Sequence, residues 1–257
     1  MIYIGPQAAI HHSIRNLSLL GRKVESKSWQ AIKGDFDTLE LLNHTIQFNI
    51  IQEHELQAHI KPSLPWADEH FEERIGGKPL NPPPSHVRWP YNKAGNLDHM
   101  VGGKFSHTYP ERIWPKRANV NPTGAQPASV YDIPHKGIRY DYGDLNDLIK
   151  LLKREPETRQ AYLPIWFPED TGAPSYQRVP CTLGYHFIKR HGHFHMTYYI
   201  RSCDIIRHFR DDIYLALKLF WWIKKQAMAQ SIPGIFTMHI VSLHCFYNER
   251  GLLKIEP

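Results

Sequence analysis

The stretch CTLGYHFIKRHGHFHMTYYIRSCDIIRHFRDD, residues 181–212, holds the clearest structural pattern of the chain. Polar and apolar residues alternate on both sides of the pair His191-Gly192, which predicts two antiparallel strands joined by a tight turn. The second strand runs into Arg201 and Ser202. Asp211 or Asp212 is then expected to open a helix, whose inner face is predicted to carry Ile213, Leu217, Phe220 and Trp221.

Further elements are predicted on both sides of this hairpin. Residues 144–154, DLNDLIKLLKR, indicate a helix that Asp144 caps and Pro156 ends. AYLPIWF (161–167) and IFTMHIVSLHCF (235–246) are typical of strands, whereas residues 35–60 are compatible with helix or strand. The pattern predicts an α+β fold with a largely antiparallel sheet.

The segment 61–137 is dense in proline and glycine, which excludes long helices and central strands. Its aromatic residues, Trp66, Trp89, Tyr109 and Trp114, favour ordered loops that form a site. We therefore expect one domain over residues 1–257, with long site-forming loops over 61–137.

Composition narrows the class of partner. A formal charge of +6 and a pI near 9.1 suit an anionic partner, and the basic residues are dispersed. A nucleotide is therefore favoured over direct binding of a nucleic acid. The three cysteines lack a CxxC spacing, so we expect no disulfide framework and no structural metal site. We expect no signal peptide or membrane span, and a cytoplasmic protein, in the host cytoplasm if a phage encodes it.

Four short motifs belong together, namely PCT at 180–182, RSCD at 201–204, RDD at 210–212 and SLH at 242–244. In this order and spacing they resemble the thymidylate synthase family. The resemblance implies a homodimer that forms through the sheet. It implies a nucleophile at Cys181, phosphate and base binding by Arg201, Ser202 and Asp204, sugar binding by His244, and an Arg159 that reaches the phosphate in the neighbouring subunit.

Two departures from the synthase pattern bear on the substrate. Asp212 stands where synthases have an asparagine that serves N3-H and O4 of uracil; a carboxylate instead accepts from the amino group of cytosine. Thr182 stands where synthases have a histidine. Both changes resemble the phage-type deoxycytidylate hydroxymethylases of the same superfamily. Arg201 and Ser202 would then hold a phosphate while Asp212 binds cytosine.

The implied chemistry is one-carbon transfer to carbon 5 of a pyrimidine nucleotide. Cys181 would add to C6 as a thiolate, whose pKa a nearby arginine would lower. The resemblance implies 5,10-methylenetetrahydrofolate as the donor, and addition of water where a synthase adds hydride. Glu69 matches the family's acid–base glutamate, with Glu72 and Glu73 as rivals, and Tyr109 resembles its active-site tyrosine.

Other interpretations stay open. The base could be uracil, methylated or hydroxymethylated, and the chain could be a nucleotide-binding protein without catalysis. Phe246 in place of a sugar-binding tyrosine, His186 in place of a glutamine, and an end at Pro257 are compatible with altered folate binding. Read alone, Cys181 is typical of a core thiol, Arg201 of a surface ion pair and Asp212 of a helix cap.

Two further groups have weaker assignments. His191, His193 and His195 could share one strand face and bind zinc, although a solvated strand is the simpler interpretation. The family's N-terminal phosphate-binding arginine has possible counterparts in three basic residues, namely Arg22, Lys23 and Lys27.

Overall fold

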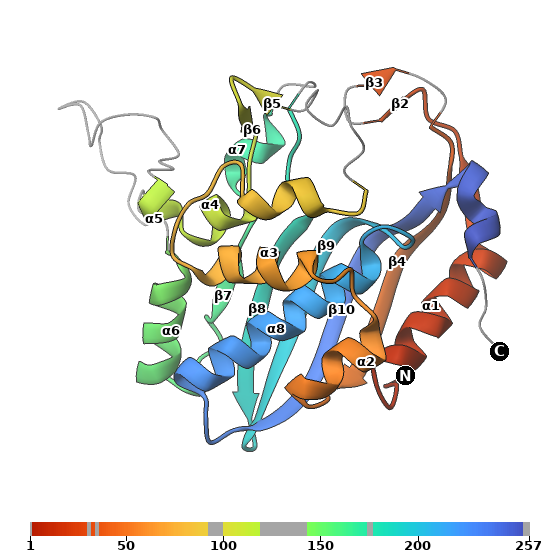
Figure 1. Ribbon diagram of the computed structural model, residues 1–257. Helices are drawn as coiled ribbons and strands as arrows, with labels where there is room; N and C mark the ends of the chain where they lie inside the picture. The colour runs from red at the N-terminus through yellow and green to blue at the C-terminus, as the bar shows by residue number, and fades with distance from the viewer. Residues whose placement is uncertain are drawn as a thin grey trace.

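The computed structural model describes residues 2–29, 32–33, 36–91, 100–118, 143–173 and 177–253. Its main sheet has the strand order β1-β4-β10-β9-β8-β7 (Figure 1). The strands are β1 (Arg22–Val24), β4 (Thr38–Asn49), β7 (Tyr162–Pro164), β8 (Thr182–Arg190), β9 (His193–Asp204) and β10 (Ile232–Phe246). Every neighbouring pair is antiparallel except β9 and β10. The predicted α+β fold with a largely antiparallel sheet is confirmed.

Helices cover the front of this sheet, with α8 and α3 side by side across it in Figure 1. The α-helices are α1 (Pro6–Leu20), α2 (Leu56–Ile60), α3 (Trp66–Ile75), α4 (Tyr109–Ile113), α5 (Pro115–Ala118), α6 (Leu145–Arg154), α7 (Pro168–Thr171) and α8 (Phe209–Ala227). Short 3-10 turns span Glu53–Glu55, Pro84–Arg88 and Tyr247–Leu252, and two-residue ribbons pair β2 (Ser28–Trp29) with β3 (Ile32–Lys33) and β5 (Met100–Val101) with β6 (Lys104–Phe105). None of the described helices has the length and apolar character needed to cross a bilayer.

The hairpin of β8 and β9 forms as its sequence predicts. His191 and Gly192 adopt φ values of 49° and 78°, the left-handed pair that a two-residue turn requires. The inward residues of β9, from Phe194 to Ile200 at every second position, pack under α8. Helix α6 also begins as predicted, because the Asp144 carboxylate accepts from the backbone N–H groups of residues 146 and 147, at 2.9 and 3.2 Å.

Helix α8 begins earlier than expected, and this changes the role of two carboxylates. It starts at Phe209, so Asp211 and Asp212 lie inside its first turn and neither is the cap. Carboxylates are favourable in a first turn as well as at a cap, because both positions lie near the positive end of the helix dipole. Asp211 accepts from the backbone N–H of Ser63 at 2.7 Å, and Asp212 faces the site described below.

Segment 61–137 contains more helix than expected. Its prolines leave residues 66–75 free, and α3 forms in that gap; α4 begins with a proline in its first turn, where the ring is tolerated. Residues 92–99 and 119–137 of the segment lie outside the described residues. The ambiguous stretch 35–60 contains β4, which pairs with β10 along most of its length.

Candidate active site

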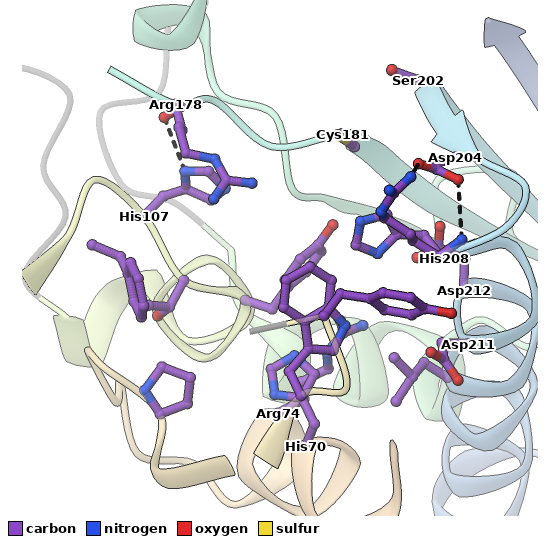
Figure 2. A pocket seen from close by; sticks show the side chains of 18 of the residues that line it. His70, Arg74, His107, Arg178, Cys181, Ser202, Asp204, His208, Asp211 and Asp212 are labelled. Atoms are coloured by element: carbon purple, nitrogen blue, oxygen red, sulfur yellow. Dashed lines mark hydrogen bonds and ion pairs between the residues drawn. The ribbon is translucent and has the colours of Figure 1, made fainter. Parts of the chain in front are cut away.

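A cavity of about 340 Å³ opens where α3, α4, α8 and the ends of β8, β9 and β10 meet (Figure 2). It lies at the end of the sheet where β9 passes into α8. The fold brings six predicted residues to this cavity from segments far apart in the sequence: Cys181, Tyr109, Ser202, Asp204, Asp212 and His244. The roles of these residues are inferred from the resemblance; their common location is a property of the structure.

Cys181 lies directly before β8 with its thiol facing the cavity. Burial raises the pKa of this thiol and Asp212 raises it further, while Arg201 and Arg178 act in the opposite direction. The arginine effect expected from the sequence is therefore present, but burial is the larger influence. Burial and Asp212 therefore favour the protonated thiol over the thiolate.

Asp212 carries a carboxyl group whose pKa is moved close to neutral pH. Burial raises the pKa of its carboxyl to about 7, against the lowering effects of Arg74 and of the Cys203 thiol, which lies 3.5 Å away. Near neutral pH both forms are therefore populated. The ionised form only accepts hydrogen bonds, whereas the protonated form also donates one.

Tyr109 is tied to the sheet by a chain of hydroxyl groups. Its hydroxyl lies 2.9 Å from that of Thr182, which lies 2.8 Å from the Tyr198 hydroxyl. The Arg74 guanidinium carbon stands 3.9 Å from the centre of the Tyr109 ring. Thr182 thus anchors Tyr109 from behind Cys181.

Asp204 accepts its hydrogen bonds from the turn that follows it in the chain. Its carboxylate accepts from the backbone N–H groups of Ile206 and Arg207, at 2.9 and 3.0 Å, and from the Arg207 guanidinium at 2.7 Å. In β10, His244 lies directly opposite Asp204. Asp204 and His244 therefore form one edge of the cavity (Figure 2 labels Asp204).

Three predicted residues do not line the cavity. Glu69 pairs with Arg88 at 2.7 Å on the outer side of α3. Arg201 donates to the carbonyl groups of Pro180 and Val179, at 2.9 and 3.1 Å, so it supports the segment that carries Cys181. Arg159 is exposed beside β8, where its carbonyl accepts from His186.

The alternative candidates for the acid–base glutamate, and one of those for the N-terminal phosphate-binding residue, also lie outside the cavity lining. Glu72 is exposed, and Glu73 is engaged by Ser85 and His70 outside the cavity wall. Lys23 pairs with Asp37 at 2.7 Å on the edge strand β1.

Two histidines of the row are engaged by the backbone. His195 accepts from the backbone N–H of Ile235 at 3.1 Å, and His193 bonds to the carbonyl of His191. Across the described part of the chain, no three histidine, cysteine or acidic side chains gather closely enough to hold a metal ion.

The sequence interpretation missed one helical stripe. Trp66, His70 and Arg74 follow each other at a spacing of four residues on α3, and all three line the cavity. His70 and Arg74 are 8% and 7% exposed, and the Nε of Arg74 has no hydrogen-bond partner in the described residues. The i, i+4 spacing was visible in the sequence, but two polar residues of this kind are usually assigned to a solvated face.

One wall of the cavity is aromatic. The rings of Trp89 and His208 are stacked at 5.2 Å and 14°, with Tyr91 5.6 Å from Trp89. The indole N–H of Trp89 is buried with no acceptor in the part of the chain that the structure describes. This orphan donor beside a flat apolar surface fits a planar heterocycle with acceptor atoms.

The sequence matches the family model of thymidylate synthase over residues 65–255. The chain belongs to the thymidylate synthase family. This family comprises one-carbon transferases that act on pyrimidine nucleotides with methylenetetrahydrofolate as donor. No curated protein matches the chain in sequence.

The structure resembles that of the thermostable thymidylate synthase A from Bacillus subtilis, with a TM-score of 0.65 and 16% identity. The similarity covers 97% of this chain and 82% of the synthase. At this identity the likeness concerns the fold, and it confirms the predicted thymidylate-synthase-like architecture.

Proposed function

We propose that the protein transfers a hydroxymethyl group to carbon 5 of a cytidine monophosphate, dCMP or CMP, with 5,10-methylenetetrahydrofolate as the one-carbon donor. The observation that carries this proposal is the presence of Asp212 in the same cavity as Cys181, close enough to raise the pKa of the thiol. One pyrimidine ring can then place C6 at the thiol and its amino group at the carboxyl.

The base assignment follows from hydrogen-bonding capacity. An ionised Asp212 accepts from the amino group of cytosine, and it also accepts from N3 when that nitrogen is protonated. The same carboxylate would face O4 of uracil with no donor and repel it. Uracil is a second candidate because the pKa of Asp212 is raised to about 7. A protonated carboxyl can accept from N3-H and donate to O4, as an asparagine does.

The reaction requires an activated C5. Addition of the Cys181 thiolate to C6 makes C5 nucleophilic, so that it can take up the one-carbon unit. Loss of the C5 proton, with departure of the folate nitrogen, leaves an exocyclic methylene on the base. Water then adds to this carbon and the Cys181 thiolate leaves C6, which gives the hydroxymethyl product. Folate supplies the carbon; Trp89, Tyr91 and His208 provide the wall against which its ring system would lie.

The remaining substrate contacts are proposed from position. Ser202, Asp204 and His244 would hold the sugar and phosphate at the rim, and Arg178, which lines the same cavity, offers a cation there. Arg201 would contribute by holding the Cys181 segment.

A second copy of the chain would complete the site. Leu42, Tyr162 and Val241 are large side chains that stay 61%, 42% and 48% exposed on the strands of the sheet. Their burial in a homodimer would bring the exposed Arg159 close to the neighbouring cavity.

The test is mass spectrometry of nucleotides after incubation of the protein with methylenetetrahydrofolate and a mixture of dCMP, CMP and dUMP. A hydroxymethyl group on a cytidine nucleotide alone is expected. A methyl or hydroxymethyl group on dUMP would overturn the base assignment. Cys181→Ala should abolish product formation while nucleotide binding persists. Absence of product from the wild type, with nucleotide binding retained, would favour a binding protein.

A further inference from the structure

We propose that His70, oriented by Glu73 and Ser85, is the proton-transfer residue of the cavity. The proposal rests on the proposed reaction at C5, which needs a group that removes the C5 proton. The glutamate expected for this step, Glu69, does not line the cavity and pairs with Arg88 at 2.7 Å. On α3, one turn of the helix separates the cavity-lining residues Trp66, His70 and Arg74, and Glu69 lies off this stripe.

The hydrogen bonds around Glu73 determine which nitrogen of His70 carries the proton. One Glu73 oxygen accepts from the Ser85 backbone N–H at 2.6 Å, and the other from the Ser85 hydroxyl at 2.5 Å. This second oxygen also lies 3.3 Å from Nδ1 of His70. A carboxylate can only accept, and the Ser85 hydroxyl, which lies 3.2 Å from Nδ1, gives its one hydrogen to Glu73. Nδ1 therefore holds the hydrogen and Nε2 keeps its lone pair.

Nε2 is left for the ligand. It has no hydrogen-bond partner among the described residues, and the side chain, 10% exposed, lines the cavity. The ring is held in orientation by Trp66, which stacks on it at 5.1 Å and 17°, and by the Tyr109 ring, whose plane is perpendicular at 6.4 Å. A histidine with one nitrogen bonded to a carboxylate and the other directed to substrate is a common arrangement for a general base.

The charge state suits this role. Burial and then the neighbouring Arg74 lower the pKa of His70 to about 4, and Glu73 offsets only part of this effect. The imidazole is therefore neutral at neutral pH and can accept a proton. Arg74 also lines the cavity. Its positive charge disfavours a protonated His70, so His70 would readily pass the proton on to the reacting groups.

His70 alone balances the protons of the steps that follow addition of the Cys181 thiolate. Once C5 has bonded to the one-carbon unit, Nε2 takes the C5 proton. The electrons of the C–H bond form the exocyclic double bond. The bond between the one-carbon unit and the folate nitrogen breaks, and its electron pair stays on that nitrogen, which receives the proton from His70. Water then bonds to the exocyclic carbon and Nε2 takes one of its protons. The double bond moves to C5–C6, the C6–S bond breaks, and its electron pair returns to Cys181, which receives the proton from Nε2.

The test separates proton removal from addition of the thiol. His70→Asn should still form the covalent Cys181 adduct with nucleotide and methylenetetrahydrofolate. It should release deuterium from 5-deuterated dCMP at least about 100-fold more slowly than the wild type. Glu73→Gln should slow the release tenfold or more, because its amide cannot serve both Ser85 donors and Nδ1. His54→Asn, a change at an exposed histidine of the turn Glu53–Glu55, is the matched control and should release deuterium at the wild-type rate.

A 5-fluorinated nucleotide provides a second readout, because fluorine cannot be removed as a cation and the adduct must stop before this step. His70→Asn and wild type should trap it equally, which also shows that the variant is folded. Free imidazole should restore turnover to His70→Ala. The proposal is overturned if His70→Asn releases deuterium at the wild-type rate, or if it forms no adduct. Failure of the wild type to form any adduct would refute the proposed function itself.

Discussion

Replacement of Asp212 by asparagine should stabilise the protein by an amount that depends on pH. Burial raises the pKa of the Asp212 carboxyl from 3.8 to about 7 in the folded state. Between these values the folded state binds more protons than the unfolded state, so the free energy of unfolding falls as pH rises through this window. A difference of one pKa unit corresponds to about 1.4 kcal/mol, so the wild type loses about 4 kcal/mol of its free energy of unfolding above pH 7. Screening by water at the cavity brings the expected effect to about 2–4 kcal/mol.

Urea unfolding at pH 4.5 and at pH 8 measures this effect. The free energy of unfolding of Asp212→Asn should exceed that of the wild type by about 2–4 kcal/mol at pH 8 and by little at pH 4.5. The reason is that the unfavourable buried charge exists only at the higher pH. Glu72→Gln, a change of the same kind on the exposed side of α3, serves as the control. An equal difference at both pH values would refute the reasoning, since asparagine would then act through shape or hydrogen bonding alone.

Three other predictions follow from contacts already described. Binding of dUMP relative to dCMP, measured by calorimetry, should increase from pH 8 to pH 6, because a protonated Asp212 can donate to O4; a constant ratio would contradict this. Arg112→Met should lower the free energy of urea unfolding by about 3–5 kcal/mol, since it leaves Asp170 buried without its two-point partner at 2.7 and 2.9 Å. Gly184→Ala should cost about 1–3 kcal/mol in the same assay, because the methyl group would lie 2.7 Å from the Leu163 carbonyl and closer to Tyr162; unchanged stability would show that β7 shifts freely.

The sequence allowed the fold to be predicted wherever periodicity and turn chemistry agreed. The β8–β9 hairpin and the cap at Asp144 are decided by neighbouring residues, so local reasoning is sufficient there. The start of α8 was placed two or three residues too late, because an aspartate is as favourable inside a first turn as at a cap. The resemblance to the thymidylate synthase family, carried by the four short motifs, also implied that Cys181 and Asp212 lie in one site, and both line the cavity.

Glu69 and Arg201 were predicted for the site but do not line the cavity, and the reason differs from that for α8. Which side of α3 faces the cavity depends on how the whole helix packs, and charged residues occur on several of its sides. Glu69 and His70 are neighbours in sequence, yet their side chains diverge by about 100° around the axis, so a family match assigned the role to a residue that lies outside the cavity. Arg201 was assigned to phosphate binding, because the two carbonyl groups that it binds carry no sequence signal.

The hydroxyl chain of Tyr109, Thr182 and Tyr198 holds the Tyr109 ring in place. It also links the direction of its hydrogen bonds to the ligand in the cavity. Each hydroxyl has one hydrogen, so if Thr182 donates to Tyr109, its bond with Tyr198 requires that Tyr198 donate to Thr182. A ligand that accepts from the Tyr109 hydroxyl uses the Tyr109 hydrogen and therefore requires this direction along the whole chain. A ligand that donates to Tyr109 does not require it, because Thr182 can then accept from both tyrosines. The hydrogen of Tyr198, a side chain 1% exposed inside the sheet, is thus directed by a ligand that Tyr198 does not contact.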